Sequence, residues 1–117
     1  MPENNKYSIS NIRVIDGDTI EADISLNFDV LLLNQRIRLQ GIQAPETNGA
    51  NKQMGLISKQ FLGEQLSKGD VYIMTSVPIR KGSFSRWLAE IIVKSGSEEI
   101  KINQLMLSER MAVEYKK

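Results

Sequence analysis

Three short segments of the sequence carry side chains that could do chemistry. The first is Asp16-Gly17-Asp18-Thr19, in which two carboxylates flank a glycine at the end of an apolar stretch. Carboxylate oxygens are ligands that hard divalent cations prefer, so one of the two aspartates is a candidate metal ligand and the other a residue that orders the turn. An ordinary hairpin turn is the alternative, because Asp-Gly is a frequent turn sequence.

The second segment, from Arg36 to Glu46, combines arginines with a carboxylate. Arg36 and Arg38 alternate with apolar residues, which places both on one face of a predicted strand. Glu46 follows Pro45, eight positions after Arg38, and a carboxylate fixed near an arginine suits activation of a water molecule beside a bound phosphate. A solvated strand face is the alternative, since structural ion pairs also produce such clusters.

The third segment is the basic stretch from Arg80 to Trp87, which contains Lys81, Phe84 and Arg86. An arginine binds phosphate through a planar, two-pronged set of donors that a lysine cannot supply. Arg86 is therefore a candidate phosphate ligand. The alternative is a surface loop that precedes a core tryptophan.

Composition narrows the chemistry that these segments can perform. The chain has no histidine and no cysteine, which excludes a Ser-His-Asp triad, a thiol nucleophile, disulfides and thiolate zinc sites. Proton transfer must fall to Asp, Glu, Lys or Tyr, and any metal must be held by oxygen, which favours Ca²⁺, Mg²⁺ or Mn²⁺. The net charge of +1 gives no general attraction to nucleic acid, so such affinity must come from a local arrangement of charges.

The elements that would position these residues follow from the hydrophobic periodicity. Alternation of apolar and polar residues, together with one apolar run, predicts strands over 9–14, 20–25, 30–33, 36–40, 71–77, 87–93 and 100–102. Helical spacing begins near Lys52 and predicts one long helix with an apolar stripe that packs in the core. The stripe consists of Met54, Ile57, Phe61, Leu62 and Leu66. Asn103 is a candidate N-cap for a short helix that ends at Arg110.

This order of elements predicts an α+β fold that is mainly β, a closed five-stranded barrel of OB type with one long and one short helix. With 117 residues the chain is expected to form one domain, residues 1–8 being a loose lead-in and residues 9–117 the folded unit. The N-terminus is polar and shows no secretory signal, and no apolar run is long enough to span a membrane. The expectation is a cytoplasmic protein without a membrane partner.

In content and in order, the three segments resemble the staphylococcal nuclease-like (thermonuclease) family. The resemblance rests on residues 14–19, 38–39, 44–47 and 86–89, with the predicted long helix in the gap before the last of them. It covers residues 9–115 and implies an OB-type barrel that lacks the final helix of the family prototype. It also implies a phosphodiesterase, an endonuclease or exonuclease that hydrolyses DNA or RNA with Ca²⁺.

The resemblance implies a role for each candidate residue. Arg38 and Arg86 match the two phosphate-binding arginines of the family. Glu46 matches its catalytic glutamate, the general base for the attacking water. Asp18 matches the first metal carboxylate, and Ala44 stands where a backbone carbonyl reaches the metal.

Supporting roles and one departure complete the implied site. Asp16 and Thr19 would order the turn around the metal ligand, and Lys81 and Phe84 would contact the substrate, although a tyrosine is common where Phe84 stands. Gln43 occupies the position of a second metal carboxylate; its amide oxygen can still ligate, but the lost negative charge lowers cation affinity. One divalent cation is expected, Ca²⁺ by resemblance, with Mg²⁺ and Mn²⁺ left open by Gln43.

A non-catalytic OB-type module that binds nucleic acid or another partner is the competing hypothesis. Such modules rely on aromatic side chains that stack on bases in a basic groove, whereas aromatic residues make up only 6% of this chain. The chain also keeps both arginines and the glutamate, which binding alone would not require. The sequence therefore favours a metal-dependent nuclease acting on DNA, RNA or both, and leaves its oligomeric state open.

Overall fold

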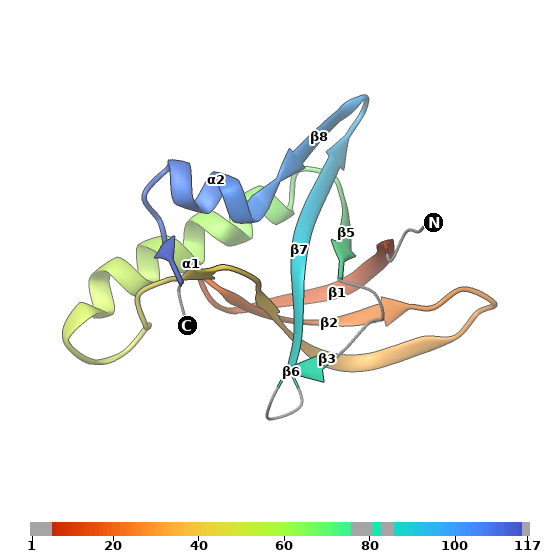
Figure 1. The fold of residues 1–117 in the computed structure, drawn as a ribbon, viewed down its shortest axis with the longest axis horizontal. Helices are drawn as coiled ribbons and strands as arrows, with labels where there is room; N and C mark the ends of the chain where they lie inside the picture. The colour runs from red at the N-terminus through yellow and green to blue at the C-terminus, as the bar shows by residue number, and fades with distance from the viewer. Residues whose placement is uncertain (1–5, 76–80, 83–85, 116–117) are drawn as a thin grey trace.

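The computed structural model describes residues 6–75, 81–82 and 86–115, with the backbone alone at residues 81, 82 and 86. The main feature of this described chain is a barrel of five longer strands (Figure 1). They are β1 (Lys6–Asp16), β2 (Thr19–Ser25), β3 (Leu31–Leu39), β5 (Asp70–Met74) and β7 (Arg86–Ser95). Antiparallel pairing joins β3, β2, β1, β5 and β7 in that order, and the parallel pairing of β3 with β7 closes the barrel. The predicted OB-type barrel is confirmed.

Short elements complete the fold. The helices are α1 (Lys52–Leu66), preceded by the 3-10 turn η1 (Gly49–Asn51), and α2 (Ile102–Ser108). The short strands are β4 (Ile42–Gln43), β6 (Lys81–Gly82), β8 (Glu98–Lys101) and β9 (Val113–Glu114). α1 packs against β1 and α2 against β7, while β4 pairs with β9 beside the barrel (Figure 1). One long and one short helix are present in the described chain, as predicted.

Several element boundaries differ from the prediction. The separate strands expected over 30–33 and 36–40 form one continuous strand, β3, because its pairing with β2 continues on both sides of a bulge at Asn34. β5 ends at Met74 and α2 at Ser108, each earlier than expected. β1 begins at Lys6, earlier than expected, because residues 6–8 pair with β5 and so belong to the barrel. β8 ends at Lys101, and Ile102 begins α2 instead of ending a strand. Ile102 is fully buried, so its apolar side chain serves the helix–barrel contact.

The sequence predicted Asn103 as the N-cap of α2, and this prediction is wrong. Asn103 lies inside the helix and is buried. Its Oδ1 accepts a hydrogen bond from the backbone N–H of Ile91 at 3.0 Å. Its Nδ2 donates to the carbonyl oxygens of Gln40 at 2.9 Å and Ala89 at 3.2 Å. This amide therefore ties α2 to β7 and to the end of β3.

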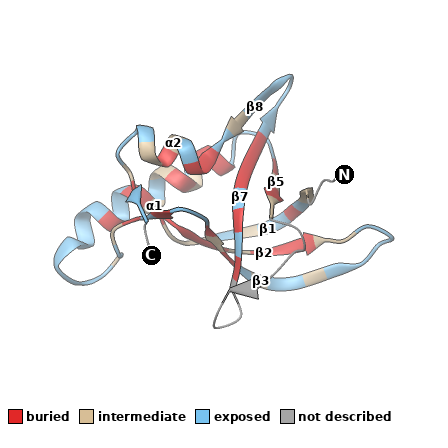
Figure 2. Cartoon of the chain, viewed as in Figure 1, coloured by how far each residue is buried: buried red, intermediate tan, exposed pale blue. Residues whose placement is uncertain are grey.

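Branched apolar side chains make up most of the barrel core, and Figure 2 shows buried segments in red on the strands of the barrel. Fully buried members include Ile20, Ile24, Ile37, Leu39, Ile73 and Ile91. The predicted apolar stripe of α1 is right for Leu62 and Leu66, which are buried, and for Phe61, which packs partly buried against the core. It is wrong for Met54 and Ile57, each of which is 49% exposed. The helix instead buries Gly55 and Ser58, because small side chains let its backbone approach the barrel closely and leave the larger ones facing solvent.

β2 and β3 continue beyond the barrel as a long hairpin, at the right of Figure 1. Its bend contains three consecutive residues with positive φ: Asn27 (77°), Phe28 (55°) and Asp29 (60°). Asn11 in β1 and Asn34 in β3 also have positive φ, and each lies where the register with β2 shifts. Asparagine tolerates the left-handed conformation better than most residues, which suits it to these bulges.

The buried carboxylate of Asp23, in β2, holds both bulges in place. It accepts hydrogen bonds from Nδ2 of Asn11 at 2.7 Å and from the backbone N–H of Asn34 at 2.8 Å. These bonds, chiefly the one from Asn11, favour the charged form and lower the pKa of Asp23 although burial opposes them. The base of the hairpin is thereby fixed relative to the barrel.

Candidate active site

A close contact positions the turn that carries Asp18. Gly17 and Asp18 join β1 to β2. A Cβ atom on Gly17 would lie 2.8 Å from the Cβ atoms of both Ala44 and Ser58, which is closer than real side chains pack. Only glycine permits this approach, and it brings the turn against α1 and against the segment that follows β4.

Asp18 is the buried centre of the predicted site, with 8% of its surface exposed. Its Oδ2 accepts a hydrogen bond from the backbone N–H of Ala44 at 2.9 Å, and its Oδ1 accepts one from the hydroxyl of Thr19 at 2.8 Å. Nη2 of Arg38 lies 3.6 Å from Oδ2 and forms an ion pair. Four residues predicted from the sequence are therefore in direct contact.

Arg38 is held by the backbone on one edge of its guanidinium. Nη1 donates to the carbonyl oxygens of Leu39 at 3.2 Å and Ile42 at 2.9 Å. The ring of Tyr115 covers the guanidinium, with its centroid 5.0 Å from Cζ, and the N–H of Tyr115 donates to the carbonyl of Gly41 at 2.9 Å. Nε and Nη2 make no hydrogen bond within the described residues, but Nη2 is ion-paired with Asp18 at 3.6 Å. An oxyanion that takes both donors of this edge would therefore lie beside the Asp18 carboxylate.

The loop after β4 presents Glu46 to solvent. Two contacts fix its backbone. The hydroxyl of Thr47 donates to Oδ1 of Asp16 at 3.1 Å, and Gly55 of α1 lies so close that a Cβ atom there would be 1.9 Å from the carbonyl oxygen of Glu46. The Glu46 carboxylate itself has no hydrogen bond or ion pair within the described part of the chain.

The start of β7 places Arg86 beside the strand that carries Arg38. In the parallel pairing Arg86 is the partner of Arg36, and Arg38 lies two positions further along β3. Adjacent strands are about 4.8 Å apart, so the backbones of the two predicted phosphate ligands are near neighbours. Lys81 lies in β6, which pairs with β7, but the side chains of Lys81 and Arg86 are not described. Phe84 lies outside the described residues.

The donor set for a metal is small. Within the described residues no three His, Cys, Asp or Glu side chains gather at one place. Gln43 is exposed in β4, next to Ala44, and the charge of Asp18 is offset by Arg38. Calcium takes about six to eight oxygen ligands, whereas magnesium keeps several waters and binds one or two carboxylates together with substrate phosphate. These donors fit a divalent cation that takes most of its ligands from water and substrate.

Two residues that contribute to this geometry were not predicted from the sequence. Tyr115 stacks on Arg38 although the two are far apart in the chain, and no local pattern links them. Gly55 supports the Glu46 loop from inside α1. Its only signal was a glycine within a helical pattern, which costs helix stability and so often has a packing reason.

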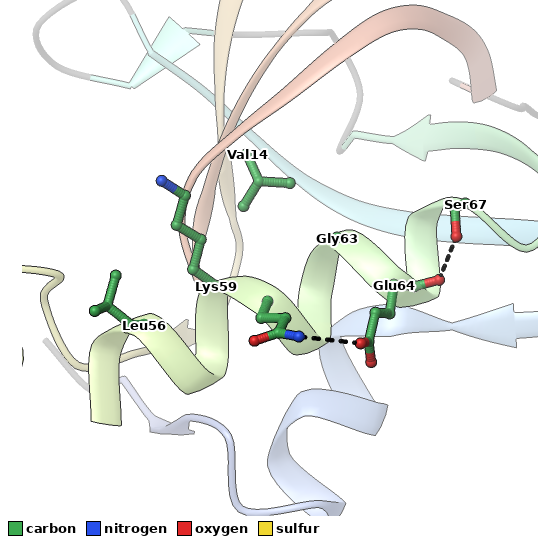
Figure 3. A pocket seen from close by; sticks show the side chains of 7 residues that line it. Val14, Leu56, Lys59, Gly63, Glu64 and Ser67 are labelled. Atoms are coloured by element: carbon green, nitrogen blue, oxygen red, sulfur yellow. Dashed lines mark hydrogen bonds between the residues drawn. The ribbon is translucent and has the colours of Figure 1, made fainter. Parts of the chain in front are cut away.

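A hollow of about 630 Å³ lies between β1 and α1 (Figure 3). Val14, Lys59 and Glu64 are among its lining residues, and none of the predicted site residues is. Glu64 is occupied by a weak hydrogen bond from Gln60 at 3.4 Å (Figure 3). The predicted site therefore lies elsewhere, at the surface turn between β1 and β2.

The comparison with protein families agrees with this fold. Residues 36–117 match the family model described as staphylococcal nuclease homologue. The match covers well over half of the chain and includes Arg38, Gln43, Glu46 and Arg86, and the chain belongs to this family. A search of curated proteins finds no match. Neither helix of the described chain has the length and apolar character needed to cross a membrane.

Proposed function

We propose that this protein is a metal-dependent nuclease that hydrolyses phosphodiester bonds in DNA, RNA or both. The observation that carries the proposal is the state of Arg38. Its Nη1 is bound to two backbone carbonyls and its guanidinium face is covered by Tyr115. Its Nε–Nη2 edge has no hydrogen bond within the described residues and carries only the 3.6 Å ion pair from Nη2 to Asp18. A guanidinium fixed in this way is prepared for a phosphate and needs little reorganisation to bind it.

The proposed reaction is in-line attack of water on phosphorus. A water oxygen forms the new bond to phosphorus, its proton passes to the Glu46 carboxylate, and the sugar oxygen on the opposite side leaves with the electrons of the broken bond. Arg38 and Arg86 neutralise the extra negative charge of the five-coordinate transition state. A divalent cation held by Asp18, Gln43 and the carbonyl of Ala44 would add positive charge beside the same phosphate.

Electrostatic stabilisation of the transition state supplies most of the rate enhancement in this scheme. Removal of one charge-stabilising donor from an active site costs about 10²-fold to 10³-fold in kcat. Arg38→Lys keeps the positive charge but loses the planar pair of donors, so we expect it to lose most of the activity that depends on Arg38. The lysine could not repeat both carbonyl contacts and a bidentate phosphate contact together.

The second candidate function is a non-catalytic binding module. The observation that favours it is the small donor set for a cation, since Asp18 already contacts Ala44, Thr19 and Arg38. Such a module would bind nucleic acid through the same arginines but would leave the polymer intact. The two functions are therefore separated by whether a covalent bond is cleaved.

The deciding experiment is hydrolysis of single-stranded DNA, duplex DNA and RNA with Ca²⁺, Mg²⁺, Mn²⁺ or EDTA. The wild-type protein is compared with Glu46→Gln and with Glu109→Gln, which removes the same charge from an exposed residue that ends α2. We expect cation-dependent cleavage that Glu46→Gln abolishes and Glu109→Gln preserves. Binding without cleavage under every ion would establish the binding module instead.

A further inference from the structure

The outer face of β3 changes from charged to apolar side chains along its length. Arg36 and Arg38 alternate with the buried Ile37, so both face outward near the site. Beyond the bulge in β3, Leu33 and Leu31 are 59% and 50% exposed on the extended hairpin. One strand face therefore runs from two arginines to exposed leucines.

The arginine end of this face belongs to a row of charges across the barrel. Arg13 in β1, Glu21 in β2, Arg36 in β3 and Arg86 in β7 are partners in successive strand pairs. Glu21 accepts a hydrogen bond from Arg13 at 2.5 Å and one from Arg36 at 3.3 Å, and these contacts lower its pKa. Arg13 and Arg36 share the single carboxylate of Glu21, so this cluster keeps a net positive charge beside Arg38.

The hairpin tip at the other end holds an aromatic ring in solvent. Phe28 is 94% exposed and is the middle one of the three consecutive residues with positive φ. A bulky residue in this conformation is unusual and points to a role for the side chain. Asp23 fixes the bulges below the tip, so the base of the hairpin that carries Phe28 is held relative to the strand that carries Arg36.

We propose that this strand face of Arg36, Leu33 and Leu31, together with Phe28 at the hairpin tip, binds the part of a single-stranded nucleic acid that adjoins the bond to be cleaved. The proposal rests on the proposed function, because the strand enters from the phosphate site at Arg38. Phosphates would contact Arg36, and unstacked bases would lie on the leucines and on the ring of Phe28. Cationic tracks combined with exposed aromatic rings are the general means of binding single strands.

Single strands are favoured over duplexes by the order of these side chains. A duplex offers sugar and phosphate on its outer surface, and its bases are stacked inside. The exposed Leu33, Leu31 and Phe28 would then face charged backbone. An unpaired strand can turn its bases toward them while its phosphates follow the arginines, so charge and apolar surface are matched together.

The test measures binding in EDTA, where no hydrolysis is needed. The probe is a fluorescent single-stranded DNA of about 12 nucleotides, a length within the span of an OB barrel, and affinity is followed by anisotropy at several salt concentrations. Arg36→Gln is compared with Lys68→Gln, an exposed charge after α1, and Phe28→Asn with Met54→Ser, an exposed apolar residue. Asparagine suits positive φ, so the tip keeps its backbone.

We expect Arg36→Gln to make the slope of log affinity against log salt shallower by about 0.7, and Phe28→Asn to weaken binding about tenfold. An abasic probe of the same length should be insensitive to Phe28→Asn, and both controls should bind as wild type. Equal affinities for Arg36→Gln, Phe28→Asn and wild type would overturn the proposal. It would also be overturned if the wild-type protein sediments as a dimer and Phe28→Asn dissociates that dimer, because Phe28 would then contact a second copy of the chain. Binding with these effects but without cleavage under any ion would refute only the nuclease function.

Discussion

The contact between Gly55 and the Glu46 loop gives the sharpest prediction. In Gly55→Ala the new Cβ atom would lie 1.9 Å from the carbonyl oxygen of Glu46 and 2.4 Å from its carbonyl carbon. Real Cβ contacts are essentially never shorter than 3.0 Å. The helix and the loop must therefore separate by about 1 Å or more, and neither partner is a flexible side chain that could move aside.

The displacement falls on the backbone of the proposed general base. A misplacement of about 1 Å can cost about 10²-fold in rate, so we expect kcat of Gly55→Ala on single-stranded DNA to fall by about that factor. The fold should persist, because alanine improves helix propensity by about 1 kcal/mol and offsets part of the strain. Denaturation monitored by circular dichroism then separates lost activity from lost structure.

Gly63→Ala is the matched control in the same helix. A Cβ atom there would meet only a methyl group of Val14 at 3.9 Å, an ordinary contact. This variant should gain about 1 kcal/mol in unfolding free energy and keep its kcat. Full activity in Gly55→Ala, or equal loss in both variants, would refute the idea that Gly55 positions Glu46.

Three further predictions concern other contacts. Hydrogen bonds from Asn11 and Asn34 lower the pKa of Asp23 below its ordinary 3.8. The charged carboxylate therefore contributes its full stabilisation above pH 3.8, and this stabilisation is lost as the pH falls through the folded-state pKa. Asp23→Asn should lower the denaturation midpoint at pH 7 and make that midpoint fall less in acid. Asn103→Leu leaves buried barrel groups without partners and should cost about 3 kcal/mol or more in chemical denaturation. Gln43→Asp adds a negative ligand and should tighten cation binding in calorimetry, whereas an unchanged affinity would exclude Gln43 as a ligand.

The barrel and the centre of the site were predictable because their signals are local. Alternating residues marked the strands, and the segments around Asp18, Arg38 and Glu46 carried both turn chemistry and family resemblance. The family match confirms the membership, and the closed barrel confirms the fold. The roles of the individual residues remain predictions that the proposed experiments test.

The remaining features depend on close approach between distant segments. Met54 and Ile57 were assigned to the core, but α1 turns Gly55 and Ser58 inward because the loop and turn backbones lie against them. Hydrophobic periodicity predicts that large apolar residues form the buried face of a helix. It cannot detect a buried face that consists of small side chains. Asn103 was likewise assigned by local pattern to a cap, whereas its partners lie on other strands.

The parallel seam between β3 and β7 has a consequence for thermal inactivation. Arg38 and Arg86 lie on opposite sides of this seam, so local opening there would separate the two proposed phosphate ligands while most of the barrel stays folded. Trp87, the single tryptophan of the chain, donates across the seam from Nε1 to Oε1 of Gln35 at 2.8 Å. Its emission is thus a built-in reporter of the opening, and activity should disappear with that signal before the far-ultraviolet spectrum changes.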